Sequence, residues 1–372
     1  MFHTVGIIYF SFVVGFGAHK VALAFTIGAA LSLAVSVPAG HLADLISPKI
    51  ISIISFTLQG LILGAQIFTK TWSIFVLLVT LECLVERFGQ NARMAYISQV
   101  GEGQKRVEAR AYMRAVTNLG IGMGTLVAGI ALAINTAFAY KTLIAIDALT
   151  FLLAAIAYNK VPALTPKLNQ SERFDWSVLK DRRYLIATLL NGCFTIHFLV
   201  QNVAIPVWVV QETNAPRWMI SFIMLLNTIA IVLFQVSSSR KATDLNQAVR
   251  LFQKASFYIA VASLIYALSH GVNAIVASLL MLIGMVVHVA GELAGSNAVW
   301  MIAMELADQR RQGAYQGIWA MGIDLTNMIG PSLLVALVIG IGQFGWVILA
   351  LWFVIVGIAM RIHLRSFVTA NL

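Results

Sequence analysis

Apolar runs of about twenty residues recur along the whole chain, and this recurrence constrains the fold more than any other feature. About 20 residues of helix cross the hydrocarbon core of a bilayer, which is roughly 30 Å thick. Lipid offers no hydrogen-bond partner to the backbone, so spanning segments are helices or strands of a closed barrel. The runs are continuous, whereas barrel strands alternate apolar and polar residues. We therefore expect an all-α membrane protein.

The breaks between these runs define twelve predicted spans, six on each side of a long hydrophilic stretch. They predict an N-terminal six-helix bundle over residues 1–158, a cytoplasmic linker over 159–184 and a C-terminal six-helix bundle over 185–372. The predicted spans cover residues 4–18, 21–43, 50–68, 73–97, 111–134, 141–158, 185–210, 217–236, 251–269, 274–304, 316–340 and 344–362.

The first predicted span is short. Residues 4–18 form at most about 22 Å of helix, which is less than the hydrocarbon thickness. One hypothesis is that Met1 is an internal start, and that the natural protein begins about 15 to 25 residues earlier and so completes this helix. The alternative is a short or tilted helix that thins the bilayer around it.

The basic residues follow an alternating pattern in the loops. If both termini are cytoplasmic, four of the 25 Lys and Arg residues lie in outer loops or at outer span ends, and eighteen lie in inner loops, at inner span ends or in the C-terminal tail. The remaining three are assigned to spans. Cytoplasmic loops retain positive charge, so this pattern predicts the cell membrane with both termini inside. The charge lies in loops rather than on one folded basic face, which argues against nucleic acid as a partner. The four outer residues are Lys20, Lys70, Lys141 and Arg217.

A short pattern, E-x-x-G-x-N-A, occurs once in each half. It runs from Glu86 to Ala92 in the fourth predicted span and from Glu292 to Ala298 in the tenth. Equivalent positions in equivalent helices indicate a duplication, so the two bundles are expected to be pseudo-symmetric. Repeats of this kind place a substrate site near the midplane, at the interface between the repeats.

The loop after the second span carries the motif Gly40-His-Leu-Ala-Asp44-Leu-Ile-Ser-Pro-Lys49. It resembles G-x-L-A-D-R-x-G-R-K of the major facilitator superfamily, although Leu, Ser and Pro replace an Arg, the Gly and the second Arg. The resemblance implies alternating-access transport and a gating role for Gly40, Asp44 and Lys49. By its own chemistry, Asp44 can accept bonds from a neighbouring helix N-terminus or pair with an arginine such as Arg93.

Ionisable groups inside spans are expensive, so each is a candidate site residue. Glu82 and Glu86 stand one helical turn apart, which suits proton carriage. Glu86 lies at the same predicted depth as Arg114, so a pair between them would stabilise both charges, and a substrate or proton could compete for it. The alternative for each polar residue is interhelical hydrogen bonding without a transport role. The candidates for coupling or substrate binding are Glu82, Glu86, Arg87, Arg114, His197, Gln201, Asn202, Asn227, His288, Glu292, Asn297 and Asp324.

These patterns favour transport over other functions. The enzyme motifs H-E-x-x-H and G-x-S-x-G are missing from the sequence, and His288 with Glu292 is too few ligands for a metal, so neither catalysis nor a cofactor is expected. We expect a monomeric secondary transporter, with proton-coupled efflux of a drug-like or metabolite substrate as the first hypothesis. An uptake symporter, a facilitator and a transporter-like receptor are the alternatives. Arginines suit an anionic substrate and glutamates a cationic one.

Overall fold

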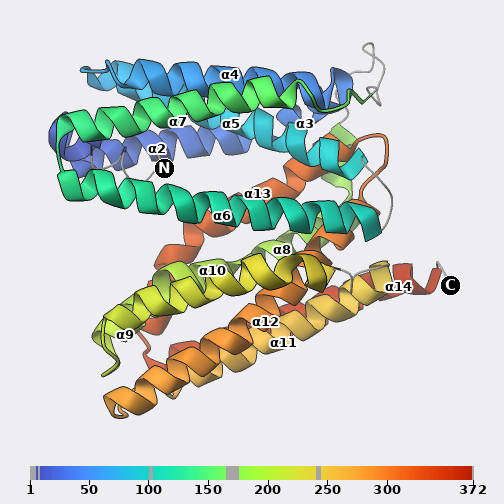
Figure 1. Cartoon of the computed structure of the whole chain (residues 1–372). Coiled ribbons are helices and arrows are strands. Elements are labelled where there is room, and N and C mark those ends of the chain that lie inside the picture. The colour runs from blue at the N-terminus through green and yellow to red at the C-terminus, as the bar shows by residue number, and fades with distance from the viewer. Residues whose placement is uncertain (1–5, 7–8, 100–103, 165–175, 240–243, 371–372) are drawn as a thin grey trace. The chain divides into compact units, whose positions relative to one another are not determined.

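The computed structural model describes residues 6, 9–99, 104–164, 176–239 and 244–370, and these residues are largely helical (Figure 1). No β-strand occurs among them. Two elements, η1 (Tyr9–Val13) and η3 (Val200–Ala204), are π-helical, and η2 (Trp176–Lys180) is a 3-10 helix. The α-helices are α2 (Ala18–Ala34), α3 (Ser36–Leu45), α4 (Pro48–Gln66), α5 (Trp72–Gln99), α6 (Gln104–Ile134), α7 (Ala137–Tyr158), α8 (Arg182–Leu199), α9 (Ile205–Gln211), α10 (Trp218–Ser239), α11 (Leu245–Ala267), α12 (Ala274–Leu306), α13 (Gln312–Val338) and α14 (Gln343–Ala370).

The helices coincide with the predicted spans from the second to the twelfth. At the first predicted span the described residues hold only η1, and the remainder of that prediction lies outside the described residues. Length and composition mark eight described helices as able to cross a membrane, or nine spans if the bent pair α2 and α3 is one. Helix α5 is not among them because Glu82, Glu86 and Arg87 lie in its middle third. The chain is a multi-pass membrane protein.

The second predicted span is broken rather than continuous. Helix α2 ends at Ala34 and α3 begins at Ser36, with a bend of 52° between them. Pro38 in the first turn of α3 has no N–H to donate to the carbonyl of Ala34, so the helix cannot run through unchanged. Helical bonding resumes from Ala39, whose N–H donates to the Val35 carbonyl.

The seventh predicted span is also interrupted. Between α8 and α9 the π-helix η3 inserts one wider turn, and the N–H of Ile205 donates to the carbonyl of Val200, five residues back. Pro206 lies directly after this turn and cannot donate to the carbonyl of Asn202. Wide turns of this kind rotate the preceding side chains, and they recur at functional sites.

The chain divides into two compact units, which we describe separately. Unit 1 comprises Met1–Val100, Leu119–Val178 and Asp308–Ile318, and unit 2 comprises Gly101–Asn118, Leu179–Ala307 and Trp319–Leu372. The start of α6 therefore belongs to unit 2 and the start of α13 to unit 1. The contiguous division at residues 158 and 184 stays a prediction, and residues 165–175 of the predicted linker lie outside the described residues.

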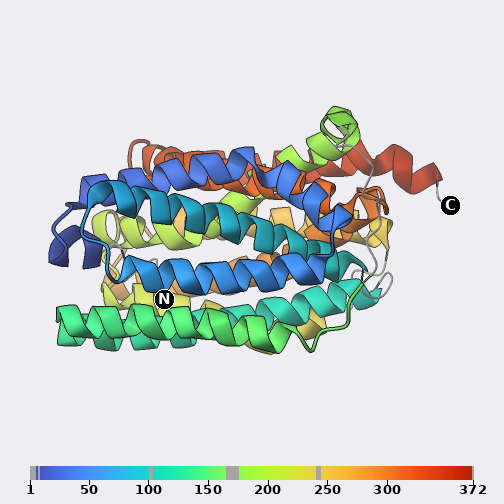
Figure 2. The ribbon, with the colours of Figure 1, turned by 90° about the horizontal axis from the view of Figure 1, so that it is seen from above.

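In unit 1, α4 packs against both α5 and α7, and Figure 2 shows α4 beside α7 along their length. The core at one end of this unit is aromatic. The ring centroids of Phe10 and Phe75 lie 4.4 Å apart, and Tyr9 lies 6.2 Å from Tyr140. This cluster anchors the described residues of η1 against α5 and α7.

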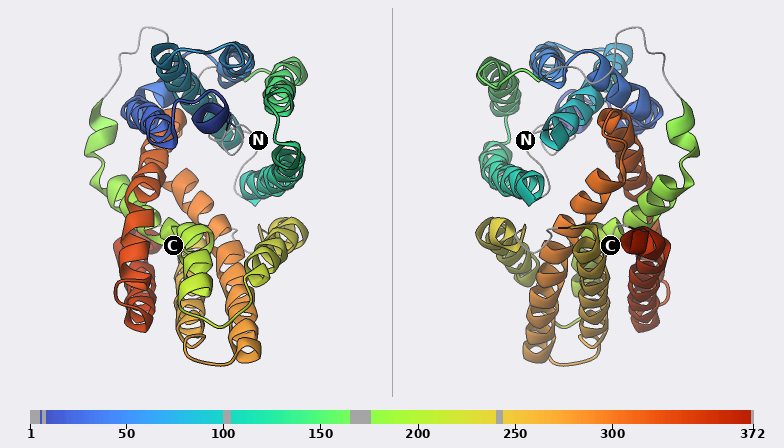
Figure 3. Two further views of the ribbon diagram at one scale, coloured as in Figure 1. Left: turned by 90° about the vertical axis from the view of Figure 1, so that its left-hand side faces the viewer. Right: turned by 90° about the vertical axis from the view of Figure 1, so that its right-hand side faces the viewer.

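In unit 2, α11 lies between α12 and α14, as Figure 3 shows in its right-hand view. Its core holds Trp208, Tyr266 and Trp346, all fully buried. The indole N–H of Trp208 donates to the Tyr266 carbonyl at 3.1 Å and to the Ser269 hydroxyl at 3.0 Å, so this buried polar group is satisfied. These contacts fix the helices that carry the polar side chains described next.

Candidate functional site

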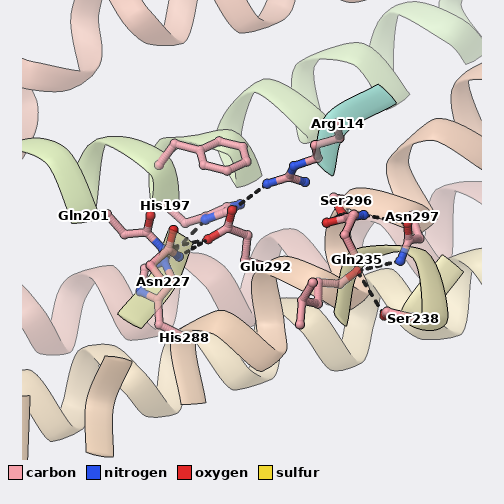
Figure 4. Close-up of polar contacts among 12 residues, drawn as sticks. Arg114, His197, Gln201, Asn227, Gln235, Ser238, His288, Glu292, Ser296 and Asn297 are labelled. Atoms are coloured by element: carbon pink, nitrogen blue, oxygen red, sulfur yellow. Dashed lines mark hydrogen bonds and ion pairs between the residues drawn. The ribbon is translucent and has the colours of Figure 1, made fainter. Parts of the chain in front are cut away.

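Glu292 of α12 is the centre of a buried polar cluster in unit 2 (Figure 4). Its side chain is only 4% exposed. One carboxylate oxygen, Oε1, accepts from Nη2 of Arg114 at 2.5 Å. The other, Oε2, accepts from Gln201 and from Asn227, each at 2.8 Å. Three donors and one positive charge thus compensate the burial of this carboxylate.

Arg114 reaches Glu292 from the start of α6, which belongs to unit 2. Its guanidinium also lies over the ring of Phe198, 5.3 Å from the centroid, and its side chain is 18% exposed. A cation on an aromatic face is attracted by the ring quadrupole. The depth argument suggested Glu86 of unit 1 as a partner of Arg114, which stays a prediction, and within unit 2 the partner of Arg114 is Glu292. Depth along a helix cannot tell which neighbouring helix faces it.

The wide turn η3 supplies Gln201 to this cluster. Gln201 is 5% exposed and donates to Glu292, whereas the next residue, Asn202, is exposed and donates to the Phe198 carbonyl of its own helix at 2.8 Å. The structure therefore includes Gln201 and Asn227 among the partners of Glu292 and leaves Asn202 outside them. A continuous helix, as expected from sequence, would have a different rotation at this level.

Two buried histidines lie one helical turn before these groups. His197 precedes Gln201 on α8 and His288 precedes Glu292 on α12, and they are 1% and 0% exposed. The Nε2 atom of His288 and the Nδ1 atom of His197 are 3.4 Å apart. Within the described residues, Nδ1 of His288 has no hydrogen-bond partner. The carboxylate of Glu292 is therefore accompanied by two buried imidazoles, which are groups that can take up and release protons.

A neutral polar layer lies on the other side of Glu292 in Figure 4. Nε2 of Gln235 on α10 donates to Ser296 and to Asn297 of α12, both at 3.0 Å. Sequence reasoning selected Asn297 but missed Gln235 and Ser296. The signal that could have found Gln235 is that it is the single glutamine in the largely apolar helix α10. In unit 1 the repeat equivalent of Asn297, Asn91, donates to the Ser36 carbonyl at the break between α2 and α3.

The carboxylates of α5 belong to unit 1 and are arranged differently. Glu82 is 8% exposed and accepts from Nε2 of Gln66 on α4 at 2.7 Å, a partner that sequence reasoning missed. Glu86 is half-buried and accepts from Gln90 of its own helix at 3.4 Å. The remaining candidates, Arg87 on α5 and Asp324 on α13, are half-buried and are not among the groups bonded to Glu292.

The loop motif forms its contacts inside unit 1. Asp44 is fully buried and accepts from the backbone N–H groups of Gly313 and Ala314, at 2.8 and 3.1 Å, in the first turn of α13. Of the two roles expected for Asp44, bonding to a helix N-terminus is therefore seen. Gly40 packs so closely on Gly313 that a Cβ atom there would collide with its carbonyl oxygen. Lys49 donates to the Asn159 carbonyl at 2.8 Å.

The described part of the chain contains no group of three or more His, Cys, Asp and Glu side chains placed to hold a metal ion. The clusters around Glu82 and Glu292 each consist of one carboxylate with neutral or basic donors. Such sets suit proton exchange and hydrogen bonding to an organic solute rather than tight metal coordination.

Comparison with known proteins supplies the context for this geometry. The family model described as Major Facilitator Superfamily matches residues 2–331. The fold resembles the human organic anion transporter MFSD10 (TETRAN), with a TM-score of 0.71, 12% identity, and coverage of 95% of this chain and 88% of that chain. It also resembles a bacterial homologue of the iron transporter ferroportin in an outward-facing state (0.71, 12%, 99% and 94%) and the E. coli fucose:proton symporter FucP (0.73, 16%, 97% and 94%). No curated protein matches the sequence significantly.

Proposed function

Because this chain belongs to the Major Facilitator Superfamily, it is a transporter of a small solute rather than an enzyme, and we propose that Glu292 couples this transport to protons. The single observation that carries the proposal is the buried carboxylate of Glu292 bonded to Arg114, Gln201 and Asn227. An ionisable residue buried within membrane-spanning helices is expensive to maintain and is a functional candidate for that reason.

The ion pair offers a simple exchange. When Glu292 is ionised it holds Arg114, and when Glu292 takes up a proton the charge that holds the guanidinium is removed. Arg114, 18% exposed, is then able to bind a negatively charged group of the substrate. Proton and anion therefore favour the same state of the pair, and this exchange would couple an anion to the proton by symport. A cationic group that competes with the proton for Glu292 would give antiport instead. The resemblance to an organic anion transporter supports a substrate with an anionic group.

We propose efflux of a drug-like or metabolite substrate as the direction, by antiport of a solute whose cationic group competes with the proton for Glu292. The support is that the buried carboxylates Glu82 and Glu292 accompany a broad apolar interior, which suits a lipophilic solute. Uptake by proton symport is the second candidate, and the resemblance to a fucose:proton symporter favours it. As part of the same proposal the protein is monomeric and lies in the cell membrane with both termini cytoplasmic, which the distribution of Lys and Arg supports.

Purified protein in liposomes loaded with a pH-sensitive dye tests the coupling. A panel of small organic anions and cations is added, and solute-driven proton movement is recorded for the parent, for Glu292→Gln and for Glu305→Gln. Glu305 is an exposed carboxylate on the same helix α12, so it controls for loss of one negative charge. We expect Glu292→Gln to lower the proton flux at least tenfold and Glu305→Gln to leave it unchanged.

Unchanged proton flux in Glu292→Gln would remove this residue from the coupling. The same vesicles separate the two directions, because an acidic lumen drives a substrate inward by proton antiport and an alkaline lumen drives it inward by symport. If the substrate accumulates only in vesicles with an alkaline lumen, efflux by antiport is refuted. A Glu82→Gln variant, measured in parallel, reports whether the carboxylate bonded to Gln66 has a share in the coupling.

A further inference from the structure

A groove with a volume of about 460 Å³ runs between α11 and α14 of unit 2, away from the Glu292 cluster. It is lined by Gln253, Lys254, Phe257, Tyr258, Val354 and Ile358. Several of its apolar side chains are far from buried, and Phe257 is 58% exposed and Ile358 43% exposed. Both helices span the membrane, so the groove opens to lipid rather than to water.

Each wall of the groove changes from basic to apolar along one helix face. On α11 the face carries Arg250, Lys254 and Phe257, at spacings of four and three residues. Residues at these spacings lie on the same side of a helix. The facing wall on α14 is lined by Val354 and Ile358, and Arg361 follows them on the same helix face, three residues after Ile358.

One hydrogen bond aligns the two basic ends. Nη1 of Arg361 donates to Oε1 of Gln253 at 2.7 Å, and Gln253 is the neighbour of Lys254 in the chain. The two positive charges are therefore at the same level, at the end of the groove that the charge distribution predicts to be cytoplasmic. The apolar part of the groove extends from this level into the membrane.

The basic end lacks an acidic counterpart on its own helices. The sequence has no Asp or Glu between Leu245 and Ala267 or between Gln343 and Ala370. Asp244, directly before α11, accepts from the N–H of Gln247 and caps the first turn. In the described part of the chain, Lys254 is exposed and makes no hydrogen bond or ion pair.

We propose that this groove binds one acidic phospholipid, with the headgroup phosphate on Lys254 and Arg361 and an acyl chain along Phe257, Val354 and Ile358. Basic pockets between spanning helices on the cytoplasmic side recognise acidic headgroups in this manner. A second copy of the chain fits less well, because a face-to-face dimer would bring the like charges of the two basic ends together. The site is independent of the proposed coupling at Glu292.

Native mass spectrometry of the detergent-purified protein, with equal amounts of phosphatidylglycerol and phosphatidylcholine, measures the binding. We compare the parent, Lys254→Gln with Arg361→Gln, and the control Lys70→Gln with Lys141→Gln, which removes two exposed basic residues from the predicted outer ends. The parent and the control are expected to retain one phosphatidylglycerol in preference to phosphatidylcholine. The first double variant is expected to bind it about 30-fold more weakly, which corresponds to roughly 1 kcal/mol for each basic side chain.

Equal retention of the two lipids by the parent overturns the proposal without reference to any variant. Equal loss in both double variants also overturns it, since a diffuse charge effect would then explain the preference. The charge-preserving variant Lys254→Arg with Arg361→Lys keeps both positive charges and is expected to retain the lipid. The melting temperature of this variant shows whether it is folded. If it melts at the same temperature as the parent and still loses the lipid, recognition by charge is refuted.

Discussion

The ion pair between Arg114 and Glu292 predicts a large and strongly non-additive effect on stability. Removing one partner of a buried ion pair costs about 3–5 kcal/mol, because the other charge stays buried without compensation. The side chain of Arg114 is 18% exposed and can turn toward water, so the lower end, about 3 kcal/mol, applies to Glu292→Gln. Glu292 keeps the donors Gln201 and Asn227 when Arg114 is replaced, so Arg114→Gln is also expected to cost no more than about 3 kcal/mol.

The double variant Arg114→Gln with Glu292→Gln leaves no buried charge at this position. We expect it to be destabilised by about 3 kcal/mol rather than the 6 kcal/mol that addition of the single variants predicts, a coupling energy of about 3 kcal/mol. Neutral hydrogen bonds between spanning helices give about 0.6 kcal/mol in comparable cycles. The pair Gln235 and Asn297, bonded at 3.0 Å on the neighbouring turn, supplies this neutral reference.

Thermal unfolding in detergent, followed by the fluorescence of the eight tryptophans, measures both cycles. At about 2 °C per kcal/mol for a chain of this size, each single charged variant should melt about 6 °C below the parent, and the double variant should melt at a similar temperature. Additivity within about 0.5 kcal/mol in the charged cycle would refute the reasoning. A coupling no larger than that of Gln235 with Asn297 would show that the charges of the pair are screened by water.

Three further predictions concern the backbone and its contacts. Gly40→Ala should destabilise unit 1 by about 1–3 kcal/mol, because the added Cβ meets a backbone carbonyl that cannot move aside. The control Gly64→Ala on α4 has open space around the new Cβ and should stabilise the protein by about 0.5–1 kcal/mol. Melting temperatures of the two variants check this, and equal shifts would contradict it. Asp44→Ala removes two bonds to the N-terminus of α13 and should cost about 1–2 kcal/mol in the same assay, while a melting temperature equal to that of the parent would count against a structural bond there. Pro206→Ala restores a backbone N–H next to the wide turn η3 and should allow a regular helix there, which would turn Gln201 away from Glu292. The coupling energy between Gln201 and Glu292, measured by a double-mutant cycle, should then fall toward zero. An unchanged coupling energy would mean that the turn does not depend on the proline.

Much of the architecture could be predicted because membrane-spanning segments have a strong sequence signal. The predicted spans from the second to the twelfth agree with the helices, and the resemblance drawn from Gly40 to Lys49 is confirmed by the match to the family model. The breaks at Val35 and at Val200–Ala204 were not predicted, although Pro38 and Pro206 mark both places. A proline within an apolar run permits a kink, a wide turn or a straight helix, and packing decides among them.

The candidate site was predicted as a set of residue types rather than as an arrangement. Arg114 and Glu292 could be selected from the sequence because burying a charge inside a membrane-spanning helix costs free energy, so such residues are rare and are functional candidates. The missed partners Gln66, Gln235 and Ser296 are neutral, and a neutral side chain in an apolar run carries little cost and therefore little signal.

The sequence by itself determined that the chain crosses the membrane repeatedly as helices, since lipid leaves the backbone no other hydrogen-bonding solution for runs of this length. It also selected Glu82 and Glu292, which are buried, although it selected the half-buried Glu86, Arg87 and Asp324 on the same ground. Only the tertiary structure decided that Arg114 bonds to Glu292 within unit 2, and that Gln201 rather than Asn202 completes the cluster. The physical reason is that pairing depends on which faces of separate helices meet, and a wide turn such as η3 changes the face on which each side chain lies.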